Sequence, residues 1–191
     1  MARIQPGYRI QDLSLPSIDG RVYSAEEALG KRYLLSFFRF AACPFCNLRV
    51  HNLVSQFDEF GDNFTVIAIF DAGIEELIKT GGRHNAPFAI LADEDNRYYR
   101  QFAVERSFLG VLKGFATRMP QLLYAVFGKG FVPLHIGGHV ATMPLNALVD
   151  EQGVVQYVHY GRDEGDHIPI EAVRRFALTG QVPFEQKVPF E

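Results

Sequence analysis

Runs of apolar residues alternate along the chain with segments of helical periodicity. Residues 33–40 and 64–70 are nearly continuous apolar runs, which are typical of strands buried on both faces of a sheet. A shorter run at 88–91 predicts a third strand of the same kind. Helical spacing predicts a helix after residue 46, which Gly61 ends, and a second helix over 73–80. This part of the chain therefore predicts a β-α-β-α-β order.

The N-terminal part has a different pattern. Apolar and polar residues alternate over 9–16, and Asp19-Gly20 predicts a hairpin turn that leads into a return strand at 21–24. Ser24 and Glu27 have the spacing of a capping box, which predicts a short helix through Leu29. We expect a β-hairpin followed by one helical turn before the first buried strand.

The C-terminal part adds two more strands and two helices. A helix capped by Asp95 or Asn96 is expected to run to about Val104. Strands are predicted over 145–149 and 154–160, joined by a tight turn, and a last helix over about 168–179. Strands and helices in this order predict an α/β fold with a mixed central sheet and helices on both faces.

Residues 105–142 do not fit the alternation. We interpret this stretch as an insertion with one or two short helices and a glycine-containing loop. Its apolar segment, 108–127, could pack into its own core, cover a neighbouring site or form the contact of a homodimer.

Composition narrows the class of protein. The chain has 191 residues, which suits one domain, and its net charge of −3 gives no electrostatic reason to expect nucleic acid. No apolar run of about 20 residues is present, and no apolar stretch follows the N-terminus. We therefore expect no membrane partner and a reducing cytoplasmic location.

The chain contains only two cysteines, Cys43 and Cys46. A disulfide between them would close a very short loop and would add little stability. A reactive pair or a metal site is therefore more plausible than a structural disulfide.

The place of this pair, between a buried strand and a helix, favours redox chemistry. The first turn of a helix has unpaired N–H groups and a positive dipole, which stabilise a thiolate there. Pro44 suits the first helical position because that position needs no N–H. Cys46 lies one turn further on, in reach of Cys43. We expect Cys43 to be the exposed attacking thiol, with Cys46 beneath it to complete exchange.

Zinc is the alternative to redox chemistry. His135 and His139 could join the two cysteines as ligands, but the gap of about ninety residues is not the spacing of a zinc finger. We expect no bound metal and no other bound cofactor.

The segment around the cysteines also carries a family resemblance. Leu35-Ser-Phe-Phe-Arg-Phe-Ala-Ala-Cys-Pro-Phe-Cys-Asn-Leu48 resembles the AhpC/TSA group of the thioredoxin superfamily, and most closely its peroxiredoxin-like members with Arg-Gly-x-Trp-Cys-Pro-x-Cys. Arg39, Cys43, Pro44 and Cys46 match that pattern, whereas Phe40 and Ala42 depart from its glycine and tryptophan. The resemblance covers most of the chain but not 105–142.

The resemblance implies a single thioredoxin-like (redoxin) domain over residues 1–191. It also implies a set of site residues. Met143-Pro144 resembles a dipeptide of that superfamily whose proline precedes a strand opposite the cysteines. In the superfamily the peptide bond before this proline is cis, and the residue before it pairs with the bound substrate through its backbone. The resemblance therefore predicts a cis bond between Met143 and Pro144. Cys43 and Cys46 would be catalytic. Arg39, Pro44, Met143 and Pro144 would position the substrate, Arg39 by holding an anion or by lowering the thiolate pKa.

Two chemistries are compatible with the resemblance. The first is thiol-disulfide exchange, with a thiol or a thioredoxin-type protein as reductant. The second is reduction of hydrogen peroxide or alkyl hydroperoxides by a thiolate. True peroxiredoxins carry Pro-x-x-x-Thr-x-x-Cys and a second arginine. When Cys46 is aligned with the cysteine of that motif, Cys43 stands at the threonine position and Arg39 at the proline position. The second arginine would fall near Pro144 and is missing. A non-catalytic binding module that uses 105–142 as its contact surface is a third possibility.

Overall fold

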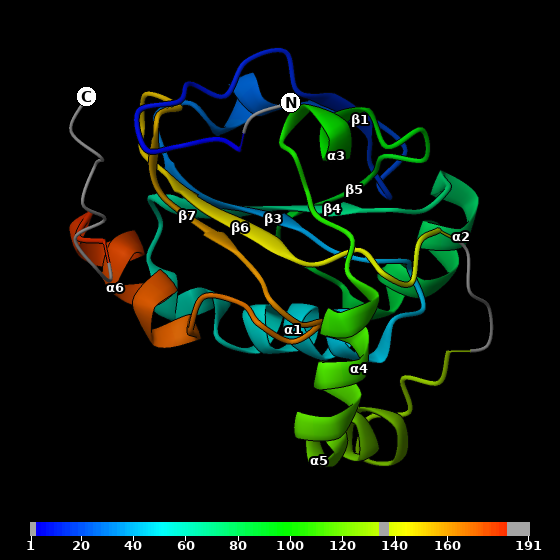
Figure 1. Cartoon of the computed structure of the whole chain (residues 1–191). Coiled ribbons are helices and arrows are strands. Elements are labelled where there is room, and N and C mark those ends of the chain that lie inside the picture. Colours follow the sequence, from blue (N-terminus) through cyan, green and yellow to red (C-terminus); the bar gives the residue numbers. More distant parts are fainter. Residues whose placement is uncertain (1–2, 134–137, 183–191) are drawn as a thin grey trace.

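The computed structural model describes residues 3–133 and 138–182. Five strands form a central mixed sheet in the order β5-β4-β3-β6-β7 (Figure 1). Strand β3 pairs in parallel with β4 and antiparallel with β6, while β5 pairs in parallel with β4 and β7 antiparallel with β6. A separate antiparallel pair, β1 with β2, lies near the N-terminus. The strands are β1 (Ser14–Pro16), β2 (Val22–Ser24), β3 (Arg32–Phe37), β4 (Phe64–Phe70), β5 (Ala89–Ala92), β6 (Leu145–Val149) and β7 (Val155–Tyr160).

Helices cover both faces of the sheet. One buried cluster joins the sheet to helices α1, α2 and α6, and the other joins it to the N-terminal strand pair and α3. The α-helices are α1 (Pro44–Ser55), α2 (Ile74–Gly81), α3 (Arg97–Gln101), α4 (Phe108–Thr117), α5 (Met119–Leu123) and α6 (Ile170–Thr179). The 3-10 turns are η1 (Ala25–Ala28), η2 (Phe57–Phe60) and η3 (Gly82–His84), and η4 (Tyr124–Gly128) is a π-helical turn.

The predicted mixed sheet is confirmed, and so is the N-terminal hairpin. The capping box is present, with Ser24 and Glu27 each accepting a backbone N–H at the start of η1. The strands predicted over 64–70 and 145–149 have the observed bounds. Helix α1 is shorter than expected because it ends at Ser55, and a 3-10 turn then leads to Gly61. Asn96 precedes α3, but the cap comes from the buried Asp93, which accepts from the N–H groups of three residues. These donors are Arg97, Tyr98 and Tyr99.

The insertion contains the expected short helices. Helices α4 and α5 continue into η4, and together they extend away from the sheet beneath α1 (Figure 1). The chain then returns to β6 through residues 138–144, where Thr142 bridges to Arg106 near the start of the insertion.

The prediction of a cis bond before Pro144 is wrong. The described residues contain no cis peptide bond, so Met143-Pro144 is trans. The trans backbone is satisfied on both sides: Met143 N–H donates to Glu105 C=O at 2.8 Å, and Pro144 C=O accepts from Gly161 N–H at 2.8 Å. The backbone N–H of Met143, the residue expected to pair with substrate, therefore already donates to Glu105 of the insertion.

Candidate dithiol site

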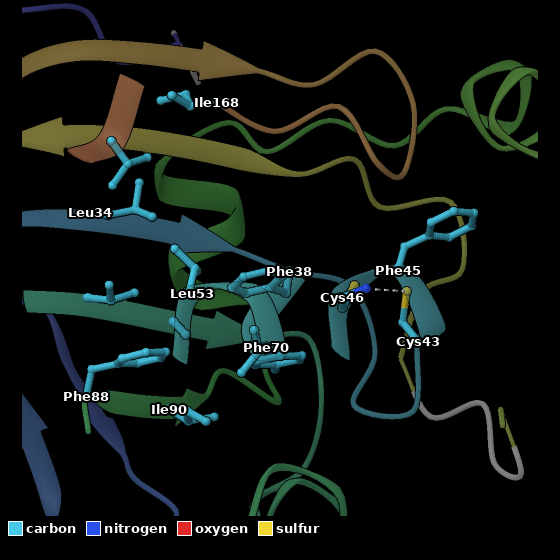
Figure 2. Close-up of a cluster of buried hydrophobic side chains, with 14 of the residues drawn as sticks. Leu34, Phe38, Cys43, Phe45, Cys46, Leu53, Phe70, Phe88, Ile90 and Ile168 are labelled. Atoms are coloured by element: carbon cyan, nitrogen blue, oxygen red, sulfur yellow. Dashed lines mark hydrogen bonds between the residues drawn. The ribbon is translucent and has the colours of Figure 1, made fainter. Parts of the chain in front are cut away.

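The two cysteines lie at the first turn of α1, at the carboxyl end of β3. Cys43 is the N-cap residue and Pro44 the first helical residue, as the sequence predicts. Cys46 N–H donates to Cys43 Sγ at 3.4 Å, and this contact is the dashed line in Figure 2. Arg39 N–H donates to Cys46 Sγ, also at 3.4 Å. Both thiols are free, so this is the geometry of the reduced pair.

The expectation that Cys43 is exposed is wrong. Its exposed fraction is 0%, and that of Cys46 is 1%. Cys43 belongs to a buried cluster with Phe40, Ala42 and Phe45, and Leu122 and Val140 of the insertion pack against that cluster. The sequence places the thiol at a helix end but does not show that α5 and η4 of the insertion pack against α1. A substrate can reach Cys43 only after these neighbours move.

The surroundings of the two sulfurs lower the pKa of Cys43 and raise that of Cys46. Burial raises the pKa of Cys43, but the contact with Cys46, the charge of Arg39 and the backbone N–H groups of Cys46 and Phe45 together lower it to about 7. Burial and the neighbouring Cys43 raise the pKa of Cys46 well above that of a free thiol. Cys43 is therefore the more acidic thiol of the pair: it is partly ionised at neutral pH, while Cys46 keeps its proton.

Arg39 is buried beside this pair and does not extend into solvent. Its guanidinium donates to the carbonyl of Val140, so the insertion helps to hold it. Arg39 Nε is buried and has no hydrogen-bond partner among the described residues. The side chain thus keeps a positive charge next to Cys43 with one donor unused.

Glu164 is a second buried charge that the sequence did not single out. Its exposed fraction is 1%, and neither carboxylate oxygen has a hydrogen-bond partner within the described part of the chain. Burial raises its pKa, whereas Arg39 and Arg118 act in the opposite direction. Its sequence neighbours, Asp163 and Asp166, make the segment read as a solvated acidic loop, so the sequence carries no signal of this burial.

Asn47 shapes the turn that precedes α1. Its amide donates to Ala41 C=O at 2.8 Å and to Cys43 C=O at 2.9 Å, and its carbonyl pairs with His84 Nε2 at 2.8 Å. Burial lowers the pKa of His84 to about 4, so the imidazole is neutral at pH 7. Phe131 of the insertion packs on that ring at 5.5 Å between ring centres.

The zinc alternative finds no support in the described residues. No group of three or more His, Cys, Asp or Glu side chains there could hold a metal ion. His139 pairs with the buried carboxylate of Asp71, at 3.0 Å from Nδ1 to Oδ2. His135 lies outside the described residues.

A groove of about 850 Å³ starts next to the pair at Ala42. It is lined along the length of α2, from Ile74 to Thr80, and by Arg83 beyond the helix. Its size is that of a pocket for a drug-sized or peptide-sized ligand.

Comparison with known proteins gives a family and a fold. Residues 6–158 match the AhpC/TSA family. No curated protein sequence gives a significant match. Among solved structures, peroxidoxin BcpB from Mycobacterium tuberculosis has a TM-score of 0.64 and 16% identity, over 92% of this chain and 95% of that one.

Two further structures have the same fold. A thiol peroxidase from Chromobacterium violaceum has a TM-score of 0.64 and 14% identity, over 94% of this chain and 89% of that one. A putative thiol:disulfide interchange protein DsbE from Chlorobium tepidum has a TM-score of 0.58 and 19% identity, over 92% and 99%. These likenesses confirm the thioredoxin-like fold that the sequence predicts, and at such identities they say nothing about the reaction.

Proposed function

This chain belongs to the AhpC/TSA family, and from that premise we propose that it is a thiol-disulfide oxidoreductase that uses Cys43 and Cys46. The observation that carries the proposal is the position of Cys43 at the N-cap of α1, where its sulfur accepts from the backbone N–H of Cys46. Cys43, whose pKa is lowered to about 7, is substantially ionised at neutral pH, and Cys46 keeps its proton. Thiolate is the nucleophile in disulfide exchange, so Cys43 attacks first.

The reaction runs in two exchange steps. The Cys43 thiolate attacks one sulfur of a substrate disulfide, forms a mixed disulfide and releases the other substrate sulfur as a thiolate, which takes a proton from water. Cys46 then loses its proton and attacks the Cys43 sulfur, which forms the Cys43–Cys46 disulfide and releases the second substrate thiolate. The substrate gains two electrons and the protein loses two. A thiol or a thioredoxin-type protein reverses the change in the chain.

Arg39 supports both steps. Its positive charge stabilises the Cys43 thiolate, and its backbone N–H is in contact with Cys46 Sγ, where negative charge develops in the second step. Pro44, Met143 and Pro144 act as positioning residues in this proposal. Pro44 starts the helix whose N–H groups face Cys43, while Met143 and Pro144 form the segment between the insertion and β6.

The groove beside Ala42 favours a disulfide substrate over hydrogen peroxide. A volume of about 850 Å³ is in the range of a pocket for a drug-sized ligand and far exceeds what a hydrogen peroxide molecule fills. The peroxidase alternative aligned on Cys46 also conflicts with the raised pKa of that thiol, because peroxide reduction needs a thiolate.

Trapping tests the proposal. The Cys46→Ser variant should form a stable mixed disulfide with a protein disulfide substrate, and the Cys43→Ser variant should form none. Wild-type reduced protein should reduce that substrate, and its thiols should be lost only slowly when it is mixed with hydrogen peroxide or an alkyl hydroperoxide. Rapid thiol loss to peroxide with no disulfide reduction would replace this function by the peroxidase. Neither activity, together with partner binding by the double serine variant, would favour a binding module.

A further inference from the structure

Helix α4 of the insertion places its smallest residues inside and its largest outside. Gly110 and Gly114 are buried against the body of the protein. Leu109, one residue before Gly110, is 80% exposed, and Leu112 is 69% exposed. The outward residues of α4 are Phe108, Leu109, Leu112 and Phe115. In an ordinary surface helix the apolar stripe faces the core, so the polarity of α4 is reversed.

Close packing on the inner side fixes this orientation. A Cβ added at Gly110 would lie 2.7 Å from Met143 Sδ and 2.9 Å from Arg162 C=O. At Gly114 an added Cβ would lie 1.9 Å from Glu164 Oε2. Only glycine fits at these two positions, so α4 cannot turn about its axis to bury its phenylalanines and leucines.

The next turns of the insertion repeat the arrangement. Ala125 is fully buried, and Leu122 packs against the core. The outward residues here are Met119, Leu123, Tyr124 and Phe127, of which Phe127 is 82% exposed. We call these four residues, together with the four outward residues of α4, the apolar hairpin surface.

This surface is cationic as well as apolar. Residues 106–149 contain none of the 22 Asp and Glu residues of the chain, and they contain Arg106, Lys113, Arg118 and Lys129. Lys113 and Arg118 both pair with the carboxylate of Asp163, and the carboxyl group of Glu164 lies under Gly114, so Lys129 is the cation of the hairpin that no carboxylate of the described residues pairs with. Lys129 lies over the Tyr124 ring at 5.8 Å from Nζ to the centroid. The hairpin is thus net positive in a chain whose net charge is −3.

From these observations we propose that the apolar hairpin surface docks on an anionic phospholipid surface. Helical segments that combine exposed Phe and Leu with lysine and arginine insert their apolar side into the headgroup region of a bilayer. Anionic headgroups attract the cations of the hairpin and repel the negatively charged remainder, so the molecule approaches with α4 and α5 first. A symmetric dimer through the same surface would instead bring two cationic hairpins together.

This inference goes beyond the proposed function and does not depend on it. The expectation of no membrane partner rested on the lack of a spanning run. No helix in the described ranges 3–133 and 138–182 is long and apolar enough to cross a bilayer. Docking at the surface requires no such helix. Because Leu122 packs against the same buried cluster that includes Cys43, the hairpin lies on the side of the sheet that carries the dithiol.

Vesicle flotation of the full, reduced chain tests the proposal. We expect binding to vesicles that contain phosphatidylglycerol, weaker binding to pure phosphatidylcholine, and a loss of binding at high salt. The double variant Leu109→Ser/Phe127→Ser should bind roughly tenfold less or weaker still, since both side chains are exposed in the free protein and would be buried in the bilayer. Leu178→Ser is the matched control, because Leu178 is 58% exposed on α6 and should not contact the bilayer.

Charge-reversal variants test whether the cations of the hairpin contribute to vesicle binding. Lys129→Glu should weaken binding to phosphatidylglycerol vesicles roughly fivefold, whereas Lys31→Glu, at an exposed site on the body, should not. Circular dichroism confirms that each variant is folded, and sedimentation reports the oligomeric state. The proposal is overturned if wild type does not float. It is also overturned if the double variant Leu109→Ser/Phe127→Ser binds as wild type does, or if the hairpin substitutions abolish a dimer and leave vesicle binding unchanged.

Discussion

At the scale of single residues, the site depends on a balance at Cys43. Burial opposes ionisation of this thiol, and the helix N–H groups, Cys46 and Arg39 outweigh it. The sequence predicted that Cys43 and Cys46 form the reactive pair, that Pro44 is the first helical residue and that Arg39 acts on the thiolate, because these predictions follow from a local motif. It could not predict that Cys43 is buried or that Glu164 lies near Arg39, since both result from packing between segments far apart in the chain.

Replacing Arg39 should weaken the thiolate. Arg39→Met removes the positive charge beside Cys43, so its pKa should rise from about 7 toward or above the ordinary value of about 8.5. Thiolate absorbance in the ultraviolet, followed against pH, measures the change. Arg100→Met, which alters an exposed residue of α3, should leave the titration as in wild type. An unchanged pKa of Cys43 in the Arg39→Met variant would show that Arg39 does not stabilise the thiolate.

The same titration predicts how stability depends on pH. The pKa of Cys43 is lower in the folded chain than in the unfolded chain, so folding favours its thiolate. This contribution to the free energy of unfolding is complete above the unfolded value of about 8.5 and is lost as the pH falls through about 7. Denaturant unfolding of the reduced protein at several pH values, compared with Cys43→Ser, should show a pH-dependent difference with that sign.

The positive charge of Arg39 stabilises the charged forms of both Cys43 and Glu164. Glu164→Gln keeps the shape of the side chain and removes its negative charge, so the pKa of Cys43 should fall. In an Arg39→Met background the same change should have almost no effect, because the shared cation is gone. Thiolate absorbance of the four proteins measures this coupling. A shift of equal size with and without Arg39 would mean that Glu164 acts by another route.

At the scale of elements, periodicity and local motifs predicted the regular part of the fold. The apolar runs gave β4 and β6 with their observed bounds, and Ser24 and Glu27 gave the capped turn η1. Two elements did not follow from such patterns. The apolar residues of 108–127 predicted helices but not that α4 would face outward, because the glycines that pack inward are poor sequence signals. The trans bond before Pro144 follows from pairing with Glu105 and Gly161, which no local pattern reveals.

Displacing α4 should uncover the thiols. Gly110→Ala adds a methyl group that would meet Met143 Sδ and the backbone of Arg162, so the helix must shift. We expect a loss of about 1–3 kcal/mol in the free energy of unfolding and faster alkylation of Cys43. Gly82→Ala is the control, since nothing lies within 4 Å of the added methyl group. If alkylation of a folded Gly110→Ala protein were no faster than that of wild type, the insertion would not limit access.

The start of α3 depends on one carboxylate. Asp93 is buried and accepts hydrogen bonds from the backbone N–H groups of three successive residues, the first of them Arg97. Asp93→Ala leaves these donors unpaired and should lower the free energy of unfolding by about 1–2 kcal/mol or more. Asp95→Ala, at an exposed neighbouring site, should change it by less than about 0.5 kcal/mol. Equal effects of the two substitutions in denaturant unfolding would contradict the assigned cap.

At the scale of the whole molecule, the insertion connects the features described above. Val140 accepts from Arg39, Leu122 packs over the cluster of Cys43, and Gly114 meets Glu164. Its other side carries the apolar hairpin surface. A partner that draws the insertion away from the body would therefore alter the surroundings of Arg39 and Glu164 together.

The assignment of Cys43 as the more acidic, attacking thiol can be tested by the rate at which each cysteine of the reduced wild-type protein is alkylated. The rate is measured against pH by quenched reaction with iodoacetamide and mass spectrometry. We expect Cys43 to react first. Its alkylation rate should rise with pH and level off, with the midpoint of the rise near pH 7. Preferential reaction at Cys46, or a Cys43 midpoint at the free-thiol value of about 8.5, would contradict this assignment.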